Sequence, residues 1–375
     1  MKFIVSASQL LHEVNLLSGV ISSNTVLPIL EDFLFDINDG KLRVSATDLE
    51  TSMATEMDVE AKDNGKIAIP AKILMETLKT LPDQPLTFDI NPKSFAVEIT
   101  SENGKYKLAG DNGDDFPKIP LADDAQSINM NASALSKAIN LTLFAVSNDD
   151  LRPAMTGVYF QMGSDGLTFV STDAHKLVRY KRSDITTENS SSFIIPKKAL
   201  GLLKGALPGD DTQVAIAYNS TNAFFTFGNV SLICRLVDAK YPDYNTVIPT
   251  DNSSELKVDR GALQNSLRRI SIYSNKTTHQ VIMKIKGNDL QVSAQDLDFS
   301  NEANEKLICE FQGEDMEIGF NAKFLVEMLG VMGSVSGNQI KMELSTPTRA
   351  GIILPMEQED GEDLLMLVMP VMLNT

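Results

Sequence analysis

Three aspartates are the residues whose spacing first suggests a chemical role. Asp48, Asp173 and Asp296 each follow a short alternating stretch, reading LRVSATD, LTFVSTD and LQVSAQD, and they lie 125 and 123 residues apart. Alternating apolar and polar residues predict a half-buried strand, so each carboxylate should stand where a strand ends. Because an active site is normally needed once and this motif recurs three times, we expect turn residues whose carboxylates accept local backbone amides.

No other group of residues has the spacing of a catalytic or metal centre. The histidines His12, His175 and His279 lack metal-ligand spacing, and there is no nucleophile elbow, phosphate-binding loop or CxxC pair. The cysteines Cys234 and Cys309 are expected to be buried strand thiols rather than disulfide or metal ligands. The sequence therefore predicts no enzyme, no cofactor and no metal site. An acidic hydrolase built on the three aspartates is a competing hypothesis.

The period of the aspartate motif is the length of a whole domain. At 375 residues the chain is long enough for three domains of about 100–150 residues, and the repeat gives the same number. Each motif is preceded and followed by a helix-like segment. The expected helices are 7–20, 132–145 and 260–272 before the motifs, and 71–80, 197–206 and 322–331 after them. Capping residues are expected at Ser6, Asn131 and Asp259, and Pro70, Pro196 and Asn321 stand just before the second set.

The remaining segments predict strands, and they define the fold class. Runs such as 213–218, 223–227 and 339–344 have strand composition, and glycine, asparagine and aspartate separate them. Each third should contain two helices and seven or eight strands. We therefore expect an α+β protein of three similar domains, each with two helices packed on antiparallel sheets. Polar linkers at 121–127 and 250–255 place the domains at 1–122, 126–250 and 254–375.

The composition is that of an ordinary globular protein with an excess of acidic residues. Hydrophobic residues make up 43% of the chain and charged residues 22%, and the net charge is −17. No apolar run reaches 18 residues, and the first residues have a strand pattern rather than a leader pattern. We therefore expect a cytoplasmic protein with no membrane partner. The negative net charge argues at first sight against a nucleic-acid partner.

The charge is unevenly distributed between the expected helices and the rest of the chain. The six helix-like segments hold ten basic and three acidic residues, whereas the remainder holds 23 basic and 47 acidic ones. On 197–206 the lysines fall on one arc and the apolar residues on the other, so the basic face is the solvent face. Two interpretations stay open: lysines that decorate exposed helices, or helices that face a polyanion. The ten are Lys72, Lys79, Lys137, Lys197, Lys198, Lys204, Arg260, Arg268, Arg269 and Lys323.

Six short motifs together resemble one protein family over the whole chain. They are LPIL at 27–30, ATDLE at 46–50, TDAHKL at 172–177, YPDY at 241–244, MEIGFN at 316–321 and VMPVML at 368–373. In this order and with a threefold period, they resemble the bacterial DNA sliding clamps, the beta subunits of DNA polymerase III. The resemblance implies the ring-forming DNA clamp fold.

By this resemblance, two chains close head to tail into a ring of six domains, with helices lining the hole and sheets forming the outer wall. The ring would encircle double-stranded DNA, contact phosphates without reading bases, and slide. As a processivity factor it would tether the replicative DNA polymerase subunit, the clamp loader, repair polymerases and other proteins that carry a clamp-binding motif. A three-domain peptide-binding scaffold without DNA is the alternative.

The resemblance also implies three sets of site residues. The peptide-binding pocket is expected at Met155, Thr172, His175, Leu177, Pro242, Val247, Val368, Met369, Pro370, Val371 and Met372. DNA contacts are expected at Arg152, Lys72, Lys79, Lys137, Lys197, Lys198, Lys204, Arg268, Arg269 and Lys276. The head-to-tail dimer interface is expected at Lys105, Tyr106, Lys107, Leu108, Ile272, Tyr273, Glu302 and Glu305. The chain departs from the family pattern at Ala174, Lys176, Thr246 and Met372, which affects the preferred peptide rather than the position of the pocket.

Overall fold

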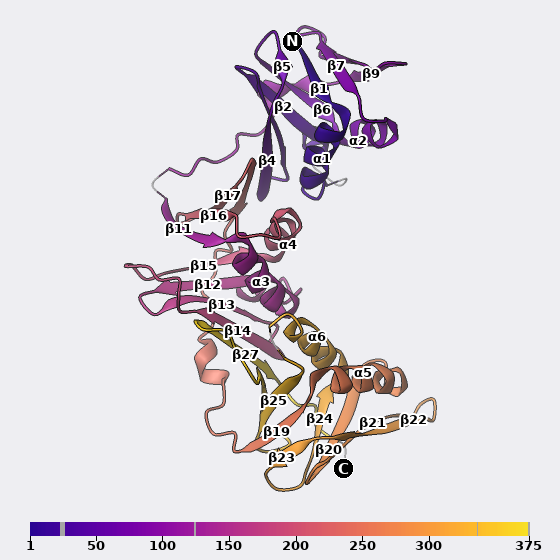
Figure 1. Cartoon of the computed structure of the whole chain (residues 1–375), viewed down its shortest axis with the longest axis vertical. Coiled ribbons are helices and arrows are strands. Elements are labelled where there is room, and N and C mark those ends of the chain that lie inside the picture. The colour runs from indigo at the N-terminus through magenta and orange to yellow at the C-terminus, as the bar shows by residue number, and fades with distance from the viewer. Residues whose placement is uncertain (23–26, 124, 336, 374–375) are drawn as a thin grey trace. The chain divides into compact units, whose positions relative to one another are not determined.

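The protein, described by a computed structural model for residues 1–22, 27–123, 125–335 and 337–373, is built from two compact units (Figure 1). The first unit comprises Met1–Ser136 and Lys198–Leu236, and the second comprises Lys137–Lys197 and Val237–Thr375. Each unit therefore combines one outer third of the sequence with part of the middle third. In both units, helices pack against antiparallel sheets, which confirms the α+β class predicted from the sequence.

The first unit contains a five-stranded and a nine-stranded antiparallel sheet. The strand order is β5-β1-β7-β8-β9 in the smaller sheet and β10-β6-β2-β3-β4-β18-β17-β16-β11 in the larger one. The larger sheet passes from the first third of the sequence to the middle third at β4 and β18, where Thr51 lies opposite Cys234. The strands are β1 (Lys2–Ser6), β2 (Asp32–Asn38), β3 (Lys41–Thr47), β4 (Thr51–Asp58), β5 (Glu60–Ala61), β6 (Gly65–Pro70), β7 (Pro85–Ile90), β8 (Ala96–Thr100), β9 (Lys105–Ala109), β10 (Asp111–Asn112), β11 (Gln126–Asn131), β16 (Gln213–Tyr218), β17 (Asn222–Phe227) and β18 (Val230–Arg235).

The second unit repeats this plan with a nine-stranded and a four-stranded sheet. The order is β15-β12-β13-β14-β27-β26-β25-β19-β23 in the larger sheet and β22-β21-β20-β24 in the smaller one. Here β14 and β27 join the middle third to the last third, with Leu177 opposite Leu367. The strands are β12 (Gly157–Gly163), β13 (Gly166–Thr172), β14 (Lys176–Arg182), β15 (Ser191–Pro196), β19 (Ser254–Asp259), β20 (Gln280–Lys286), β21 (Asp289–Asp296), β22 (Asn301–Ile308), β23 (Glu310–Gln312), β24 (Met316–Asn321), β25 (Gln339–Leu344), β26 (Gly351–Pro355) and β27 (Glu362–Val368).

The strand count differs slightly from the prediction of seven or eight in each third. Over the described residues the three thirds contain ten, eight and nine strands. The surplus comes from very short edge strands, namely β5 and β10 with two residues each and β23 with three. Without them, each third has eight strands.

Six α-helices occur in the described residues, close to their predicted positions. They are α1 (Ala7–Leu17), α2 (Ala71–Thr80), α3 (Ala132–Thr142), α4 (Lys197–Ala206), α5 (Arg260–Ile270) and α6 (Ala322–Met332). The bounds of α2 and α4 match the prediction, and α6 is one residue longer. The helices α1, α3 and α5 end earlier than predicted. In α3 and α5 the predicted last residues form the 3-10 turns Leu143–Ala145 and Ser271–Tyr273 instead.

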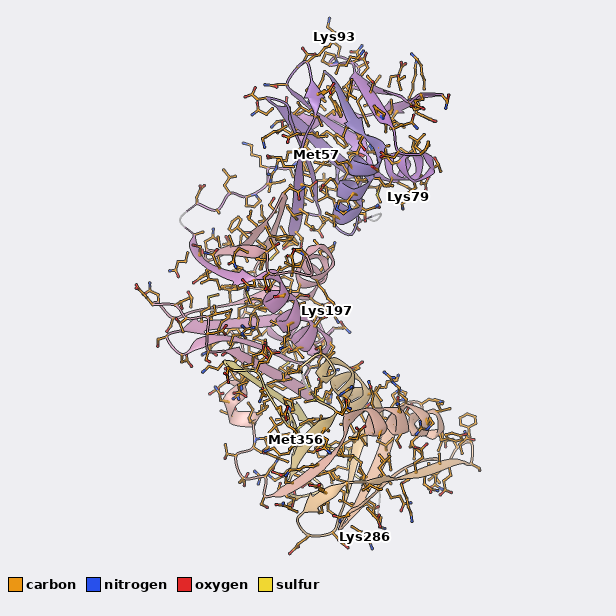
Figure 2. The ribbon with its side chains drawn as sticks, viewed as in Figure 1. Met57, Lys79, Lys93, Lys197, Lys286 and Met356 are labelled. Carbon is orange, nitrogen blue, oxygen red and sulfur yellow. The ribbon has the colours of Figure 1, made fainter. Side chains whose placement is uncertain are left out.

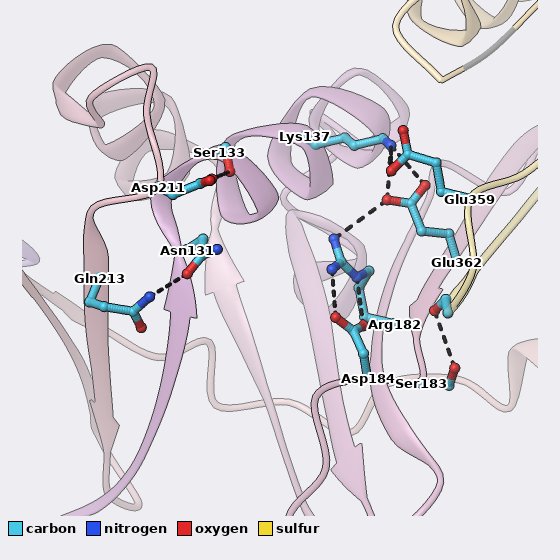
Figure 3. Close-up of polar contacts among 11 residues, drawn as sticks. Asn131, Ser133, Lys137, Arg182, Ser183, Asp184, Asp211, Gln213, Glu359 and Glu362 are labelled. Carbon is cyan, nitrogen blue, oxygen red and sulfur yellow. Dashed lines mark hydrogen bonds and ion pairs between the residues drawn. The ribbon is translucent and has the colours of Figure 1, made fainter.

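Two of the predicted capping residues bond to the first turn of their helices. Ser6 Oγ accepts a hydrogen bond from Gln9 N at 3.3 Å, and Asp259 Oδ1 accepts one from Ala262 N at 2.6 Å. Each bond satisfies an amide that has no partner inside the helix, which stabilises the helix by about 1 kcal/mol. The carboxamide of Asn131 accepts a hydrogen bond from Gln213 Nε2 and so connects β11 to β16 (Figure 3).

Aromatic side chains pack together in the core of each unit. In the first unit Phe3 stacks on Phe88 with ring centroids 4.7 Å apart, and Phe35 lies 6.2 Å from Phe88. In the second unit Phe160 meets Phe169 edge to face at 4.7 Å. All five rings are at most 1% exposed. Burial of each such side chain contributes about 1.5–3 kcal/mol. In the first unit, Phe3 and Phe88 on the smaller sheet meet Phe35 on the larger one, so these rings hold the two sheets together.

The recurring aspartates are turn residues, as predicted. Asp48 Oδ1 accepts the backbone amides of Glu50 and Thr51 at 3.0 and 2.6 Å, and Asp173 Oδ1 accepts the corresponding two amides at 2.9 Å each. Among the described residues, Asp296 Oδ1 accepts one backbone amide, that of Asp298, at 3.2 Å. The carboxylates therefore hold strand-to-strand turns, and the third copy has drifted from the other two.

The residue after each of the first two aspartates adopts a left-handed conformation. The φ angles are 76° at Leu49 and 75° at Ala174. A side chain at such an angle costs about 1–2 kcal/mol relative to the usual conformation. The preceding threonines support the turns, since Leu49 N donates to Thr47 Oγ1 and Ala174 N donates to Thr172 Oγ1, each at 3.1 Å.

Both cysteines are free and buried, as predicted. Cys234 lies on β18, whereas Cys309 stands between β22 and β23 rather than in a strand. Burial raises the pKa of the Cys234 thiol to about 12, and burial likewise raises the pKa of Cys309. A high pKa keeps a thiol protonated and unreactive. Over the described residues, no cluster of three or more histidine, cysteine or acidic side chains has a metal-binding arrangement, and no helix has the length and apolarity that a membrane span requires.

Candidate functional site

One face of the larger sheet in the second unit carries an apolar cluster, which we call the junction cluster. Leu177 on β14 is paired with Leu367 on β27, and Leu367 is paired with Ile352 on β26. Paired residues in an antiparallel sheet point to the same face, so these three side chains form one continuous row. The junction cluster consists of Val170, Leu177, Ile194, Tyr241, Tyr244, Ala350, Ile352, Leu365 and Leu367.

The segment between β18 and β19 crosses this face and is fixed to it. Tyr241 stacks on Tyr159 with centroids 4.6 Å apart and an interplanar angle of 7°, and Tyr244 Oη donates a hydrogen bond to Gln161 Oε1 at 2.7 Å. The backbone amide of Val237 also donates to the carbonyl of Ile194, at 3.0 Å. Stacking of this kind adds about 0.5–1.5 kcal/mol beyond burial alone. The segment therefore forms a fixed wall above the sheet.

The Tyr241 hydroxyl is buried and has no hydrogen-bond partner in the described part of the structure. Burial is the main cause that raises the pKa of Tyr241 above its usual range, so the group is a neutral donor. An unpaired buried hydroxyl costs about 1–3 kcal/mol. The junction cluster therefore contains a donor that an arriving carbonyl or carboxamide oxygen would satisfy.

The residues predicted for the pocket surround the junction cluster, but they differ widely in exposure. Val247 is 55% exposed, Met369 is 41% exposed and Met372 is 66% exposed, so an apolar rim faces solvent. His175 and Pro242 are also exposed, Met155, Pro370 and Val371 are partly buried, and Thr172 and Leu177 are buried. The backbone brings the rim together, because Met369 N donates to His175 O and Val371 N donates to Gly319 O, each at 2.8 Å.

Val368, which was also predicted for the pocket, does not share the sheet face of the junction cluster. It is fully buried, and it alternates with Leu367 along β27, so it points to the opposite face of the sheet. Leu367 occupies the junction cluster instead. The alternation of LLMLV was visible in the sequence, but the sequence alone did not say which set faces the cluster. The cluster residues Ile352, Leu365 and Leu367 were missed for the same reason.

Lys176, a position where the chain departs from the family pattern, is a buried structural cation. Its ammonium lies 3.2 Å from a carboxylate oxygen of Asp173 and 3.2 Å from one of Glu327 on α6. It also lies 4.4 Å from the centroid of the Phe324 ring, against which His175 stacks at 6.2 Å. A desolvated cation over a ring contributes up to about 2 kcal/mol. Lys176 therefore ties the aspartate turn to α6 and positions His175.

A polar hollow of about 500 Å³ adjoins the junction cluster on the same face of the sheet. Tyr159 and Tyr244 form the boundary between the two. Its charged side chains pair with one another, because Arg179 lies 2.7 Å from Asp363 and Lys181 lies 2.8 Å from Asp165. The hollow is therefore close to neutral.

In the first unit, the predicted DNA contacts lie on the solvent faces of α2 and α4. On α2, Lys72 and Lys79 are exposed while Leu74 and Leu78 are buried, as the helical spacing predicted. Lys79 is labelled on α2 in Figure 2. Lys204 is similarly exposed on α4, where Leu200 and Leu203 are fully buried. Among the described residues these three lysines form no ion pair. Lys198 differs, because its ammonium pairs with the Asp48 carboxylate.

Most predicted DNA contacts of the second unit already have partners within the chain. Arg269 forms two bonds to Glu305 at 2.6 and 2.7 Å, and Arg152 Nε lies 2.9 Å from Asp149. Lys276 Nζ donates to the carbonyl of Ile272 at 3.0 Å, and Lys197 Nζ donates to Asn148 at 2.9 Å. Arg268 is exposed and forms no ion pair within the described residues.

Lys137 is held in an ion network rather than directed to solvent (Figure 3). Its side chain is 17% exposed, and its Nζ lies 2.8 Å from Glu362, whose own side chain is 2% exposed. Arg182, also 17% exposed, approaches Glu362 at 3.4 Å and Asp184 at 2.6 Å. The Arg182 guanidinium lowers the pKa of Asp184. Through Glu362 the network joins α3 and β14 to the start of β27.

Six of the eight predicted dimer residues lie on two edge strands, and Ile272 and Tyr273 lie in the 3-10 turn after α5. The strand β9 ends the five-stranded sheet of the first unit, and β22 ends the four-stranded sheet of the second. Lys105 and Lys107 lie 2.9 and 3.3 Å from Glu98, and they alternate with the partly buried Tyr106 and Leu108. Glu302 on β22 is exposed, whereas Glu305 is already bonded to Arg269. Beside β22, Ile272 and Tyr273 are 64% and 43% exposed.

Comparisons with known proteins match the chain from end to end. Models of the N-terminal, central and C-terminal domains of the DNA polymerase III beta subunit match residues 1–120, 129–243 and 245–371. Beta sliding clamps of Synechocystis sp. and Pseudomonas putida are 30% and 28% identical, with 100% of each chain covered. Structures of DnaN sliding clamps from Pseudomonas aeruginosa and Bartonella birtlesii, both bound to griselimycin, are 26% and 27% identical, with TM-scores of 0.93 and 0.91 and 100% of each chain covered.

The ion network predicts a difference between two neighbouring glutamates. Changing Glu362→Gln removes the 2.8 Å carboxylate partner of the largely buried Lys137, whose remaining contact is the exposed Glu359 at 3.4 Å, and this should lower the free energy of unfolding by about 3 kcal/mol. The matched change Glu359→Gln removes a 3.4 Å contact from a side chain that is 69% exposed, and it should cost at most about 1 kcal/mol. Denaturant midpoints of the two variants measure the difference. Equal midpoints would contradict the structural role of the network.

Proposed function

Because the chain belongs to the DNA polymerase III beta subunit family, the bacterial DNA sliding clamps, we propose how its residues perform the work of a clamp. The chain is a processivity factor and not an enzyme. Two copies form a ring that encircles duplex DNA, and the ring tethers the replicative polymerase, the clamp loader and repair proteins. The observation that carries this conclusion is the match of three consecutive clamp domains over nearly the whole chain.

A sliding clamp is retained on DNA by the closed ring around the duplex rather than by tight binding to it, and the charge distribution of this chain is compatible with weak binding. A closed ring stays on DNA because it surrounds it, so each phosphate contact can be weak and exchangeable. Lysines on mobile side chains supply such contacts without reading base sequence. A net charge of −17 limits unspecific binding of other polyanions to the remaining surface.

For the peptide-binding pocket, we assign the junction cluster as its floor. The exposed apolar rim of Val247, Met369 and Met372 supplies contact area, and flexible methionine side chains adapt to different sequences. The occupants are short linear segments with a glutamine and hydrophobic residues. The orphan hydroxyl of Tyr241 offers a donor for a carboxamide or carbonyl oxygen. Leu367 replaces Val368 in this assignment, and the other predicted residues remain.

For the DNA-facing set, Lys72, Lys79, Lys204 and Arg268 are the foremost candidates. They are exposed, and within the described residues no carboxylate competes for their charge. A lysine or arginine already paired with a carboxylate must lose that partner before it meets a phosphate, which reduces its net gain. By this argument Lys198, Arg152 and Arg269 are secondary contacts. Lys197 and Lys276, which donate to neutral oxygen atoms, are intermediate candidates. Lys137 is a structural cation of the Glu362 network.

For the dimer interface, we assign the edge strands β9 and β22. Each has unpaired backbone groups along one side, so one edge can extend the other across the ring. Lys105 and Lys107 face an acidic edge that includes Glu302, and the exposed Ile272 and Tyr273 supply the apolar part of the contact. Because the two surfaces differ, the contact is head to tail and closes at two copies.

We assign the three clamp domains to 1–122, 126–250 and 254–375. Residues 374 and 375 of the third domain and residue 124 of the first linker lie outside the described structure. A bacterial replication factor acts on the chromosome, and the cytoplasm is therefore the location that we assign to it.

A topological test distinguishes a ring from an open scaffold. The dimer, once loaded by its clamp loader on nicked circular DNA, should remain bound through gel filtration at raised salt, because the ring cannot pass a closed circle. Cutting the circle once should release it, since the ring slides off a free end. Equal loss from circular and linear DNA would contradict encirclement and favour a peptide-binding scaffold.

The pocket assignment predicts a difference between two methionines of equal exposure. Met369 and Met356 are each 41% exposed, but only Met369 lies on the pocket rim. Met369→Asp should weaken binding of a fluorescein-labelled peptide with a glutamine and a hydrophobic pair by about tenfold or more, because an apolar contact of about 1.5–3 kcal/mol is lost. Met356→Asp should leave the affinity unchanged. Fluorescence anisotropy measures both, and similar affinities for the two variants would refute the assignment.

The DNA-facing assignment predicts a change in salt dependence. Combining Lys72→Gln, Lys79→Gln and Lys204→Gln should flatten the plot of log affinity against log salt by about 0.9 for each phosphate contact removed. The control combines Lys62→Gln, Lys93→Gln and Lys286→Gln, which change exposed lysines outside the helices. Lys93 and Lys286 are labelled in Figure 2. Anisotropy of the dimer with a short duplex at several salt concentrations gives the slopes. An unchanged slope in the helix variant would exclude these lysines as phosphate contacts.

A further inference from the structure

The first unit contains a hollow of about 730 Å³ at the position that corresponds, in the internal repeat, to the junction cluster and its polar neighbour. The aspartate motifs align the two places with an offset of 125 residues, so Leu34 corresponds to Tyr159 and Ser45 to Val170. The pairings agree, because Leu34 lies opposite Ser45 and Tyr159 lies opposite Val170. The hollow is therefore a structural counterpart of the candidate pocket.

The correspondence extends across the strands that join neighbouring thirds of the chain. In the second unit Leu177 is opposite Leu367, which is opposite Ile352. In the first unit Ser52 is opposite Ile233, which is opposite Phe224. Phe224 and Ile233 both line the hollow, so an apolar pair occupies the same two positions as Ile352 and Leu367.

The covering wall is also repeated. In the second unit the segment with Tyr241 and Pro242 crosses the sheet. In the first unit the segment with Phe116 and Pro117 lines the hollow together with Ile119, Pro120 and Leu121. Phe116 is 6% exposed and Tyr241 is 7% exposed, so each aromatic ring anchors its segment, whereas Leu121 remains 74% exposed. Both junctions thus place an apolar wall over a sheet face.

The charge of the two places differs. Arg43 and Lys66 of the first hollow stand where the second unit has Thr168 and Ser192. Lys66 lies 3.3 Å from Asp36, whereas Arg43 donates to the hydroxyl of Ser231 at 3.2 Å. Arg43 and Lys118 form no ion pair within the described residues.

The charged side chains that line the hollow are Arg43, Lys66, Lys118, Asp36 and Asp114, a net of +1 in a chain whose net charge is −17. Ser45, Ser52 and Ser231 stand where the second unit has Val170, Leu177 and Leu365. The sheet face beneath the hollow of the first unit therefore has fewer apolar groups and more hydroxyl groups than the face beneath the junction cluster. The hollow therefore suits an occupant with fewer apolar anchors and a negative charge.

We propose that this first-junction hollow, lined by Leu34, Arg43, Phe116, Lys118, Phe224 and Ile233, is a second peptide-binding site of the chain, and that it takes a short linear segment of another protein with an apolar anchor and acidic residues. The anchor packs on Phe224 and Ile233 beneath the 116–121 wall. An acidic side chain of the segment pairs with Arg43 and Lys118. The volume lies within the range of about 300–1,000 Å³ that is usual for ligand sites.

Charge selectivity follows from the uncompensated cations. A carboxylate that meets a partly desolvated guanidinium gains a charge-assisted hydrogen bond, which is roughly twice as strong as a neutral one. A segment with asparagine in place of aspartate keeps its shape and loses this gain. The correspondence with the second unit rests on the pocket assignment made above, whereas the volume, the apolar pair and the unpaired cations belong to the first unit itself, so the two assignments can fail separately.

The test uses the full-length dimer and two synthetic nonapeptides. One peptide has a leucine-phenylalanine pair followed by three aspartates, and the other has asparagines in their place. Both carry fluorescein and a benzophenone photo-crosslinker, and mass spectrometry locates the crosslinks. We expect crosslinks of the acidic peptide on 116–122 or 224–233, and at least tenfold fewer of the neutral peptide there. Crosslinks confined to 241–248 and 365–373, or none at all, would overturn the proposal.

Two variants separate charge from shape. Arg43→Glu combined with Lys118→Glu should reduce crosslinking of the acidic peptide at the first junction about tenfold, whereas the matched control Lys62→Glu with Lys93→Glu should not. Thr226→Trp places a large ring on an exposed lining position and should block both peptides without a change of charge. Crosslinking that persists in both the charge-reversed and the tryptophan variants would also overturn the proposal.

Discussion

The structure depends on two backbone ladders that join neighbouring thirds of the chain. In the first unit β4 pairs with β18, and in the second β14 pairs with β27, so each larger sheet is continuous across a junction. A ladder fixes its register to one residue, and a slip of one would turn every side chain to the opposite face. The pairing of Leu177 with Leu367, and hence the floor of the peptide site, is a direct result of this constraint.

The same constraint explains what the sequence could and could not predict. Periodicity located the six helices, and the repeat located the aspartate turns, because both depend on neighbouring residues. The choice between Val368 and Leu367 depends instead on a strand that lies 190 residues away in the sequence, opposite Leu177. No local pattern contains that register.

The sequence also predicted only part of the electrostatics, namely which basic side chains are exposed but not which of them are ion-paired. Counting basic residues on helices identified Lys72, Lys79 and Lys204 correctly as exposed. It could not show that Lys137 is enclosed by Glu362 or that Lys198 faces Asp48, since those carboxylates come from distant segments. An exposed helical lysine and an ion-paired one look alike in a sequence. Electrostatic roles therefore required the tertiary structure.

The two buried thiols have a practical consequence for studies of motion. Cys234 and Cys309 are 0% and 4% exposed, and burial raises the pKa of both, so few molecules present a thiolate to solvent. The native chain is therefore a nearly silent background for maleimide chemistry. A single cysteine introduced on an exposed strand could carry a fluorophore while both native thiols are kept, and ring opening could be followed in the otherwise unaltered protein.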